Sequence, residues 1–174
     1  MTTIELGGLS DLDAVVEAWI ALAADQRQHG SQVLPEPNRN AIRGVVGSHV
    51  LHGGLLVARD EGEYAAGEGE QGAGDLVGFV TFGPEDGGFE LDTNRGVIRH
   101  LWVREDRRSE GVGSELLDAA EQRLAERGIE QVSLEVLAEN EAARRFYRER
   151  GYGTHRLELA KELDGPGEGG RPDG

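Results

Sequence analysis

The segment from Val97 to Leu117 constrains the fold more than any other part of this sequence. Apolar and aromatic residues from Val97 to Val103 predict a β-strand, and apolar residues after Gly113 recur at helical spacing. A short turn containing Gly111 and Gly113 joins the two. Because glycine has no Cβ, the backbone of such a turn can approach a bound group closely. The segment therefore predicts a strand, a tight turn and a helix in direct succession.

The predicted turn has the properties of an anion site. The first N–H groups of a helix have no partner within the helix, and the helix dipole adds partial positive charge there. A pyrophosphate is a suitable ligand for such a helix start. Two common nucleotide motifs are absent, because the only lysine is Lys161 and Leu116 stands where a dinucleotide fingerprint needs its third glycine. Two glycines alone also fit an ordinary glycine-rich helix start.

The rest of the sequence predicts a single α+β domain with the element order β-α-α-β-β-β-α-β-α-β. We expect a domain over residues 1–163, a mobile hairpin loop over 61–74 and a disordered tail over 164–174. The loop consists almost entirely of Glu, Gly, Ala and Gln, and the tail of Gly, Pro and charged residues. The predicted strands are 4–6, 55–58, 76–82, 97–103, 131–137 and 152–159, and the predicted helices are 11–30, 38–53, 111–127 and 140–150.

The composition bounds the setting and excludes several classes of function. The chain has 33 acidic and 18 basic residues and a net charge of −15, which disfavours a nucleic-acid partner. It has no cysteine, which excludes disulfides, thiolate metal sites and a cysteine nucleophile, and we expect no metal. No export signal or membrane-spanning run is visible, so we expect a soluble cytoplasmic protein. The acidic, lysine-poor surface favours a salt-rich cytoplasm over the alternative of a GC-rich genome.

A second motif follows the predicted strand at 131–137. Asn140, Ala143, Phe146, Tyr147, Gly151 and Tyr152 match Asn-x-x-Ala-x-x-(Phe/Leu)-Tyr-x-x-x-Gly-(Phe/Tyr), and Arg108-x-x-Gly111-x-Gly113 matches Arg/Gln-x-x-Gly-x-Gly/Ala. With these two motifs in register, the chain resembles the GCN5-related N-acetyltransferase (GNAT) superfamily. The specific part of the match covers about residues 75–160.

The resemblance implies a three-layer α/β/α fold with a mixed, centrally splayed sheet. It also implies an enzyme that uses acetyl-CoA as cosubstrate and acetylates a primary amine through a ternary complex. The small-molecule amine is the first interpretation, and a protein N-terminus or lysine is the alternative. A non-catalytic acyl-CoA sensor is a third interpretation of another class. The sequence also leaves a homodimer open.

The resemblance assigns the cofactor contacts to two segments and one asparagine. The pantetheine arm is expected along the main chain at the end of the strand 97–103, and the pyrophosphate on the turn that follows. Asn140 is expected either to cap the last helix or to touch the cofactor arm, and both roles are compatible. The expected cofactor-binding residues are Leu101, Trp102, Val103, Arg108, Ser109, Glu110, Gly111, Val112, Gly113, Ser114, Asn140 and Tyr147.

The resemblance also assigns Tyr147 as the catalytic general acid that protonates the thiolate of CoA. A core position for this residue is the competing interpretation. The base is open, because the sequence has Val97 and Arg99 where many members of the superfamily have a glutamate. His100, Glu90, Glu135 or a water chain are the substitutes, and Arg99 is a candidate contact for an acidic substrate group. For the acceptor wall the candidates are Trp19, Gln26, His29 and the loop 32–34, with Trp19 more probable in the core.

Overall fold

The computed structural model describes residues 1–61 and 74–165 of the chain. It divides into two compact units, residues 1–140 and the residues from 141 onward. The predicted mobile loop at 61–74 lies almost entirely outside the described residues, and so does most of the predicted tail.

The first unit contains a five-stranded sheet in the order β1-β2-β3-β4-β5. Neighbouring strands are antiparallel except β4 and β5, which are parallel, so the sheet is mixed. The strands are β1 (Thr2–Leu6), β2 (Leu55–Asp60), β3 (Leu76–Pro84), β4 (Arg95–Val103) and β5 (Gln131–Leu134). The helices of this unit are α1 (Leu12–Arg27), α2 (Arg39–Leu51) and α3 (Val112–Glu126), with short 3-10 turns η1 (Leu9–Asp11), η2 (Glu36–Asn38) and η3 (Glu105–Arg107).

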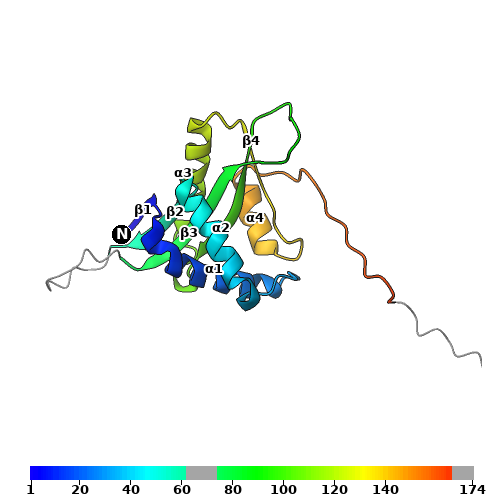
Figure 1. Ribbon diagram of the computed structural model, residues 1–174, viewed down its shortest axis with the longest axis horizontal. Coiled ribbons are helices and arrows are strands. Elements are labelled where there is room, and N and C mark those ends of the chain that lie inside the picture. Colours follow the sequence, from blue (N-terminus) through cyan, green and yellow to red (C-terminus); the bar gives the residue numbers. More distant parts are fainter. Residues whose placement is uncertain (62–73, 166–174) are drawn as a thin grey trace, which may run out of the picture. The chain divides into compact units, whose positions relative to one another are not determined.

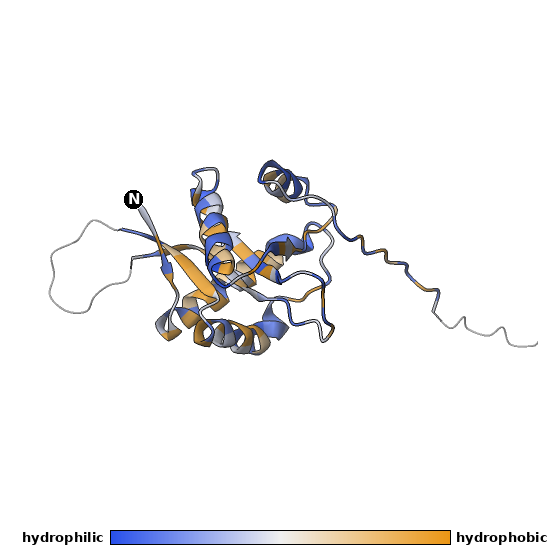
Figure 2. Ribbon diagram, turned by 90° about the horizontal axis from the view of Figure 1, so that it is seen from above, coloured by the Kyte–Doolittle hydropathy of each residue, from blue (hydrophilic) through white to orange (hydrophobic). Residues whose placement is uncertain are grey.

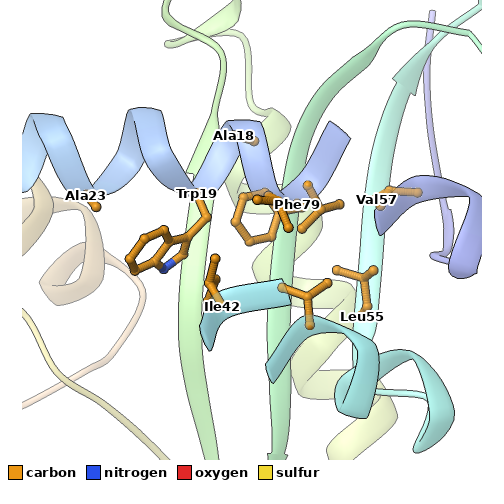
Figure 3. Close-up of a cluster of buried hydrophobic side chains, with 10 residues drawn as sticks. Ala18, Trp19, Ala23, Ile42, Leu55, Val57 and Phe79 are labelled. Atoms are coloured by element: carbon orange, nitrogen blue, oxygen red, sulfur yellow. The ribbon is translucent and has the colours of Figure 1, made fainter. Parts of the chain in front are cut away.

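One face of the sheet is covered by α1 and α2. Trp19 from α1, Ile42 from α2, Leu55 and Val57 from β2 and Phe79 from β3 belong to one buried cluster, drawn in Figure 3. The exposed fraction of Trp19 is 8%, which confirms the prediction that it belongs to the core. Each fully buried aliphatic or aromatic side chain contributes roughly 1.5–3 kcal/mol to folding, so this cluster fixes both helices against the strands.

The opposite face is covered by α3. A Cβ added at Gly78 would lie 3.0 Å from Leu116 Cδ1, whereas the next residue, Phe79, packs with α1 and α2. Because successive strand residues point to opposite faces, the sheet lies between two helical layers (Figure 1). Figure 2 shows the apolar residues concentrated on the central strands. The expected three-layer α+β fold is therefore present. The glycine at position 78 allows β3 and α3 to approach each other closely.

The second unit contains α4 (Glu141–Glu149), in agreement with the helix predicted at 140–150. The predicted strand at 152–159 is wrong, because residues 152–165 have no regular secondary structure. A strand is stabilised by a hydrogen-bonded neighbour and a buried face, but Leu157 and Leu159 are 77% and 91% exposed. The strand predicted at 131–137 is also shorter than expected and ends at Leu134.

Candidate functional site

The turn between β4 and α3 has the backbone geometry of an anion site. Gly111 precedes the first residue of α3 and has a φ of 89°, which is a left-handed conformation that glycine adopts without strain. Ser109 also has a positive φ, 66°, and is the only described non-glycine residue that does. The first hydrogen bond into α3 runs from the N–H of Glu115 to the carbonyl of Gly111 at 3.0 Å. The N–H groups of Val112 and Gly113, the first two residues of α3, therefore precede this bond at the start of the helix.

Arginine side chains hold this turn in place. Arg107 forms ion pairs with Asp60 at the end of β2 and, at 2.6 Å, with Glu110 inside the turn. It also donates a hydrogen bond to the hydroxyl of Thr2 in β1 at 3.1 Å. Arg108 donates from Nε to the carbonyl of Val103 at 3.0 Å. The turn is thus fastened to β1 and β2 as well as to the end of β4.

The two middle strands separate just before this turn. The pairing of β4 with β5 ends at Ile98 and Leu134, while the pairing of β4 with β3 continues to Val103. Among the described residues, the far edge of β4 after Ile98 has no neighbouring strand. An extended ligand therefore has a free strand edge beside the anion site to pair with.

The hydrogen-bond pattern shows which β4 residues offer main-chain groups at that free edge. The N–H of Arg104 donates to the carbonyl of Val77 at 2.8 Å, so Arg104 points its backbone groups toward β3. Because these groups alternate in an antiparallel pair, Leu101 and Val103 point theirs away from β3, and Trp102 points its own toward it. Of the three expected contacts, Leu101 and Val103 thus lie on the free edge, and the main chain of Trp102 does not.

A second cluster lies on the face of β4 covered by α1 and α2. His100 Nδ1 lies 2.9 Å from the hydroxyl oxygen of the fully buried Thr81. The indole ring of Trp19 meets the imidazole edge-on, with ring centroids 6.3 Å apart. Burial, with smaller contributions from His49 and Arg99, lowers the pKa of His100 to about 4. His100 is therefore a neutral hydrogen-bonding group at pH 7.

His49 from α2 belongs to this cluster, and sequence reasoning missed it as a site residue. Burial lowers its pKa, and so do the charges of Arg99 and, to a smaller extent, His52. Its Nδ1 lies 3.1 Å from the place where a Cβ of Gly54 would stand. In the sequence, His49 is one of several residues on an amphipathic helix, and only the packing of α2 on the sheet brings it near β4.

The other candidate bases occupy different places. Glu135 is exposed and comes directly after the last residue of β5, at the point where β4 and β5 separate. Glu90 is exposed in the loop between β3 and β4. Of the two glutamates, Glu135 thus stands directly after β5, next to the opening.

Of the candidates for the acceptor wall, Gln26 and His29 are partly buried at the end of α1 and just after it. Residues 32–34 are exposed in the connection from α1 to α2. Both groups therefore stand at one end of the helical layer that covers His100.

Tyr147 lies in α4, in the second unit. Its ring meets those of Phe146 and Tyr152 edge-on, with centroids 5.2 and 5.8 Å apart. Burial raises the pKa of Tyr147 to about 12, so the phenol keeps its proton at neutral pH. Asn140 directly precedes α4, which is the position of an N-cap residue.

Residues 1–61 and 74–165 contain no group of three or more His, Asp or Glu side chains able to hold a metal ion. Across the same residues, no helix has both the length and the apolar character that crossing a membrane requires.

Comparison with known proteins identifies the family. The family model described as "Acetyltransferase (GNAT) family" matches residues 17–152. No curated protein sequence is significantly similar to the chain.

Solved structures share the fold at low sequence identity. A predicted acetyltransferase with acetyl-CoA from Clostridium acetobutylicum is 14% identical, with a TM-score of 0.70 over 94% of this chain and 97% of its own. An aminoglycoside acetyltransferase from an uncultured soil sample, in complex with sisomicin, is 17% identical, with a TM-score of 0.62 over 94% and 97%. A ribosomal-protein-alanine N-acetyltransferase from Brucella melitensis is 19% identical, with a TM-score of 0.61 over 94% and 100%.

Proposed function

Because this chain belongs to the GNAT acetyltransferase family, we propose that it transfers the acetyl group of acetyl-CoA to the primary amine of a small molecule. The observation that carries the proposal is the continuous path from the free edge of β4 to the glycine turn. That path offers main-chain partners for an extended amide-containing arm and then the N–H groups at the start of a helix for a pyrophosphate.

In this proposal the cofactor lies along the end of β4 and across the start of α3. Leu101 and Val103 pair with the two amides of the pantetheine arm, and the N–H groups from Ser109 to Ser114 bind the pyrophosphate. Arg108 is exposed, and its Nε is committed to the carbonyl of Val103. The remaining N–H groups of its guanidinium add charge-assisted contacts to a phosphate.

The reaction we propose is a direct attack of the amine on the thioester carbonyl. The C–N bond forms, the tetrahedral intermediate collapses, the C–S bond breaks, and CoA leaves as a thiolate. Tyr147 donates its proton to that sulfur, and the phenolate recovers a proton that the attacking nitrogen gives up. Since the pKa of Tyr147 is about 12 and that of a thiol is about 8.5, this transfer needs a short hydrogen bond and prompt return of the proton.

His100 is a poor candidate for the base that deprotonates the amine. An efficient general base has a pKa near the working pH, and the pKa of His100 is about 4. Glu135, beside the opening between β4 and β5, and a water chain are the other candidates. In this proposal His100 orients water or the amine as a neutral hydrogen-bond partner.

A protein amine is the second candidate acceptor, and it is supported by the fold shared with the ribosomal-protein-alanine N-acetyltransferase. The small-molecule proposal has the corresponding support from the aminoglycoside acetyltransferase. Thiol release from acetyl-CoA with a panel of small amines, alongside mass shifts in a proteome digest, separates the two. Acetylation of peptides without turnover of any small amine would overturn the first candidate.

We also propose that the protein works in a salt-rich cytoplasm, which its net charge of −15 supports. Salt shortens the distance over which the acidic side chains repel one another. The melting temperature should therefore rise steeply between low and molar KCl. A flat curve would favour the alternative of an ordinary acidic surface.

A further inference from the structure

Arg99 differs from the other arginines of β4 and the turn in having no partner. Arg95 pairs with Glu85 at 3.3 Å, Arg104 with Asp106 at 2.6 Å, and Arg107 with Asp60 and Glu110. Within residues 1–61 and 74–165, Arg99 has no ion pair or hydrogen bond, although it is an exposed charge in a chain with 33 acidic residues. A cation kept free of carboxylates in such a chain is available for an anionic ligand.

The position of Arg99 in the strand is unusual as well. Thr81 of β3 pairs with His100, and the next residue, Phe82, pairs with Ile98, which leaves Arg99 as the extra residue of a β-bulge. Such bulges turn a side chain away from its regular direction. Arg99 is also the first residue of β4 after the last pair with β5. It therefore stands where the two strands begin to separate.

The neighbours of Arg99 are neutral rather than acidic. Its charge lowers the pKa of both His49 and His100, so both imidazoles lie within its electrostatic reach. Both are half-buried, and the lowered pKa of each favours the neutral imidazole at pH 7. The groups that shift these two imidazoles include two histidines, an arginine and a backbone group, but no carboxylate. Arg99 also has no ion pair within residues 1–61 and 74–165, so no described carboxylate neutralises its charge at contact distance.

We propose that Arg99 binds the carboxylate of the acceptor, so that the substrate is a primary amine that also carries a carboxylate. The planar guanidinium matches a carboxylate with two parallel hydrogen bonds. A single guanidinium beside two neutral imidazoles balances one negative charge, whereas a phosphate dianion would need a second cation. This inference rests on the proposed function, because it assigns the acceptor of the same reaction.

The test compares amines in matched pairs. Each pair consists of an amino acid and its primary amide, which differ in the charge of one group. In the wild-type protein, kcat/KM should favour the carboxylate form about ten- to hundredfold, the usual worth of a hydrogen-bonded charge. Arg99→Gln should abolish that preference mainly by raising KM, and Arg99→Lys should keep part of it. An amine carrying a phosphate provides a further arm, and a preference for it over the carboxylate would overturn the proposal.

Arg123→Gln serves as the matched control. Arg123 lies on α3 and, like Arg99, has no ion pair within the described ranges. Its loss should leave the carboxylate preference unchanged. Unchanged affinity for CoA and an unchanged melting temperature would show that Arg99→Gln folds and binds cofactor normally.

Calorimetric titration of the CoA complex with the same pairs measures acceptor binding without turnover. Equal affinity for the acid and the amide, or equal binding of the acid by wild type and Arg99→Gln, would overturn the inference about Arg99. Failure of the proposed function looks different. In that case no amine releases thiol from bound acetyl-CoA, while the titration still reports whether Arg99 selects carboxylates.

Discussion

The two ends of the free part of β4 use arginine in opposite ways. After Val103, Arg107 and Arg108 each bond to neighbouring side chains or carbonyls, and these bonds hold the turn against three strands. At the other end, Arg99 has no ion pair among the described residues, and its charge acts on the two imidazoles of His49 and His100. The difference suggests that charges at the turn fix the backbone for a common cofactor, whereas Arg99 selects a particular acceptor.

The largest effect should come from a bulky side chain at the start of α3. Gly113→Trp places an indole where the pyrophosphate is expected, so CoA binding should be lost altogether. The measurement is the Kd for CoA by calorimetry. Gly44→Trp, on α2 in open space, is the control and should bind CoA normally. Normal binding by Gly113→Trp would mean that the turn is not the cofactor site.

Tyr147→Phe tests whether Tyr147 acts in proton transfer and not in the binding of CoA or the acceptor. The phenylalanine keeps the ring contacts with Phe146 and Tyr152 but has no proton to donate. We expect kcat to fall about 10²–10⁴-fold, the usual contribution of a general acid, with the Kd for CoA unchanged. A fall in CoA affinity with unchanged kcat would instead assign Tyr147 to binding alone.

Arg107→Gln should have a smaller effect at the cofactor end. Without Arg107, the carboxylate of Glu110 stands unneutralised beside the expected phosphates, and the Kd for CoA should rise about tenfold, or roughly 1.4 kcal/mol. The additional change Glu110→Gln should restore most of that loss. An acetyl thioester without phosphates should show no change in KM. If that thioester is affected equally, Arg107 acts on the fold and not on phosphate binding.

Arg104→Gln is the matched control for Arg107→Gln. Arg104 has an ion pair with the exposed Asp106, outside the segment from Ser109 to Ser114. Its loss should therefore leave the Kd for CoA nearly unchanged. An equal loss of CoA affinity in both variants would contradict the proposal that Arg107 acts by neutralising Glu110.

The last effect concerns acid stability and not binding or turnover. His100 has a pKa of about 4 in the fold, below its ordinary value of 6.5, so its contribution is present above pH 6.5 and is lost as the pH falls toward 4. Over that window the free energy of unfolding should decrease by up to about 3 kcal/mol. His100→Gln should show a shallower decrease in urea unfolding measured at pH 7 and 4.5. An identical pH dependence in both proteins would show that His100 is not buried as described.

Local sequence patterns were sufficient for most of the fold. The glycines of the turn, the helix after them and the core position of Trp19 follow from spacing and residue type, which are local properties. The strand expected at 152–159 was wrong, because alternating leucines predict a strand only where a neighbour and a covering layer exist. Its exposed Leu157 and Leu159 have neither a strand partner nor a buried face.

The acceptor side of the site was far less predictable. The bulge at Arg99 depends on the register between β3 and β4, and no single strand sequence specifies a register. The approach of His49 to His100 depends on how α2 packs on the sheet. The cofactor side is different, because its chemistry lies in consecutive backbone groups and is therefore visible in the sequence.

A crystal structure of the protein with bound CoA tests the central claim most directly. We predict that the pyrophosphate accepts hydrogen bonds from N–H groups between Ser109 and Ser114, and that the pantetheine amides pair with Leu101 and Val103. Cofactor bound at full occupancy in another place, with the start of α3 facing only solvent, would contradict the account.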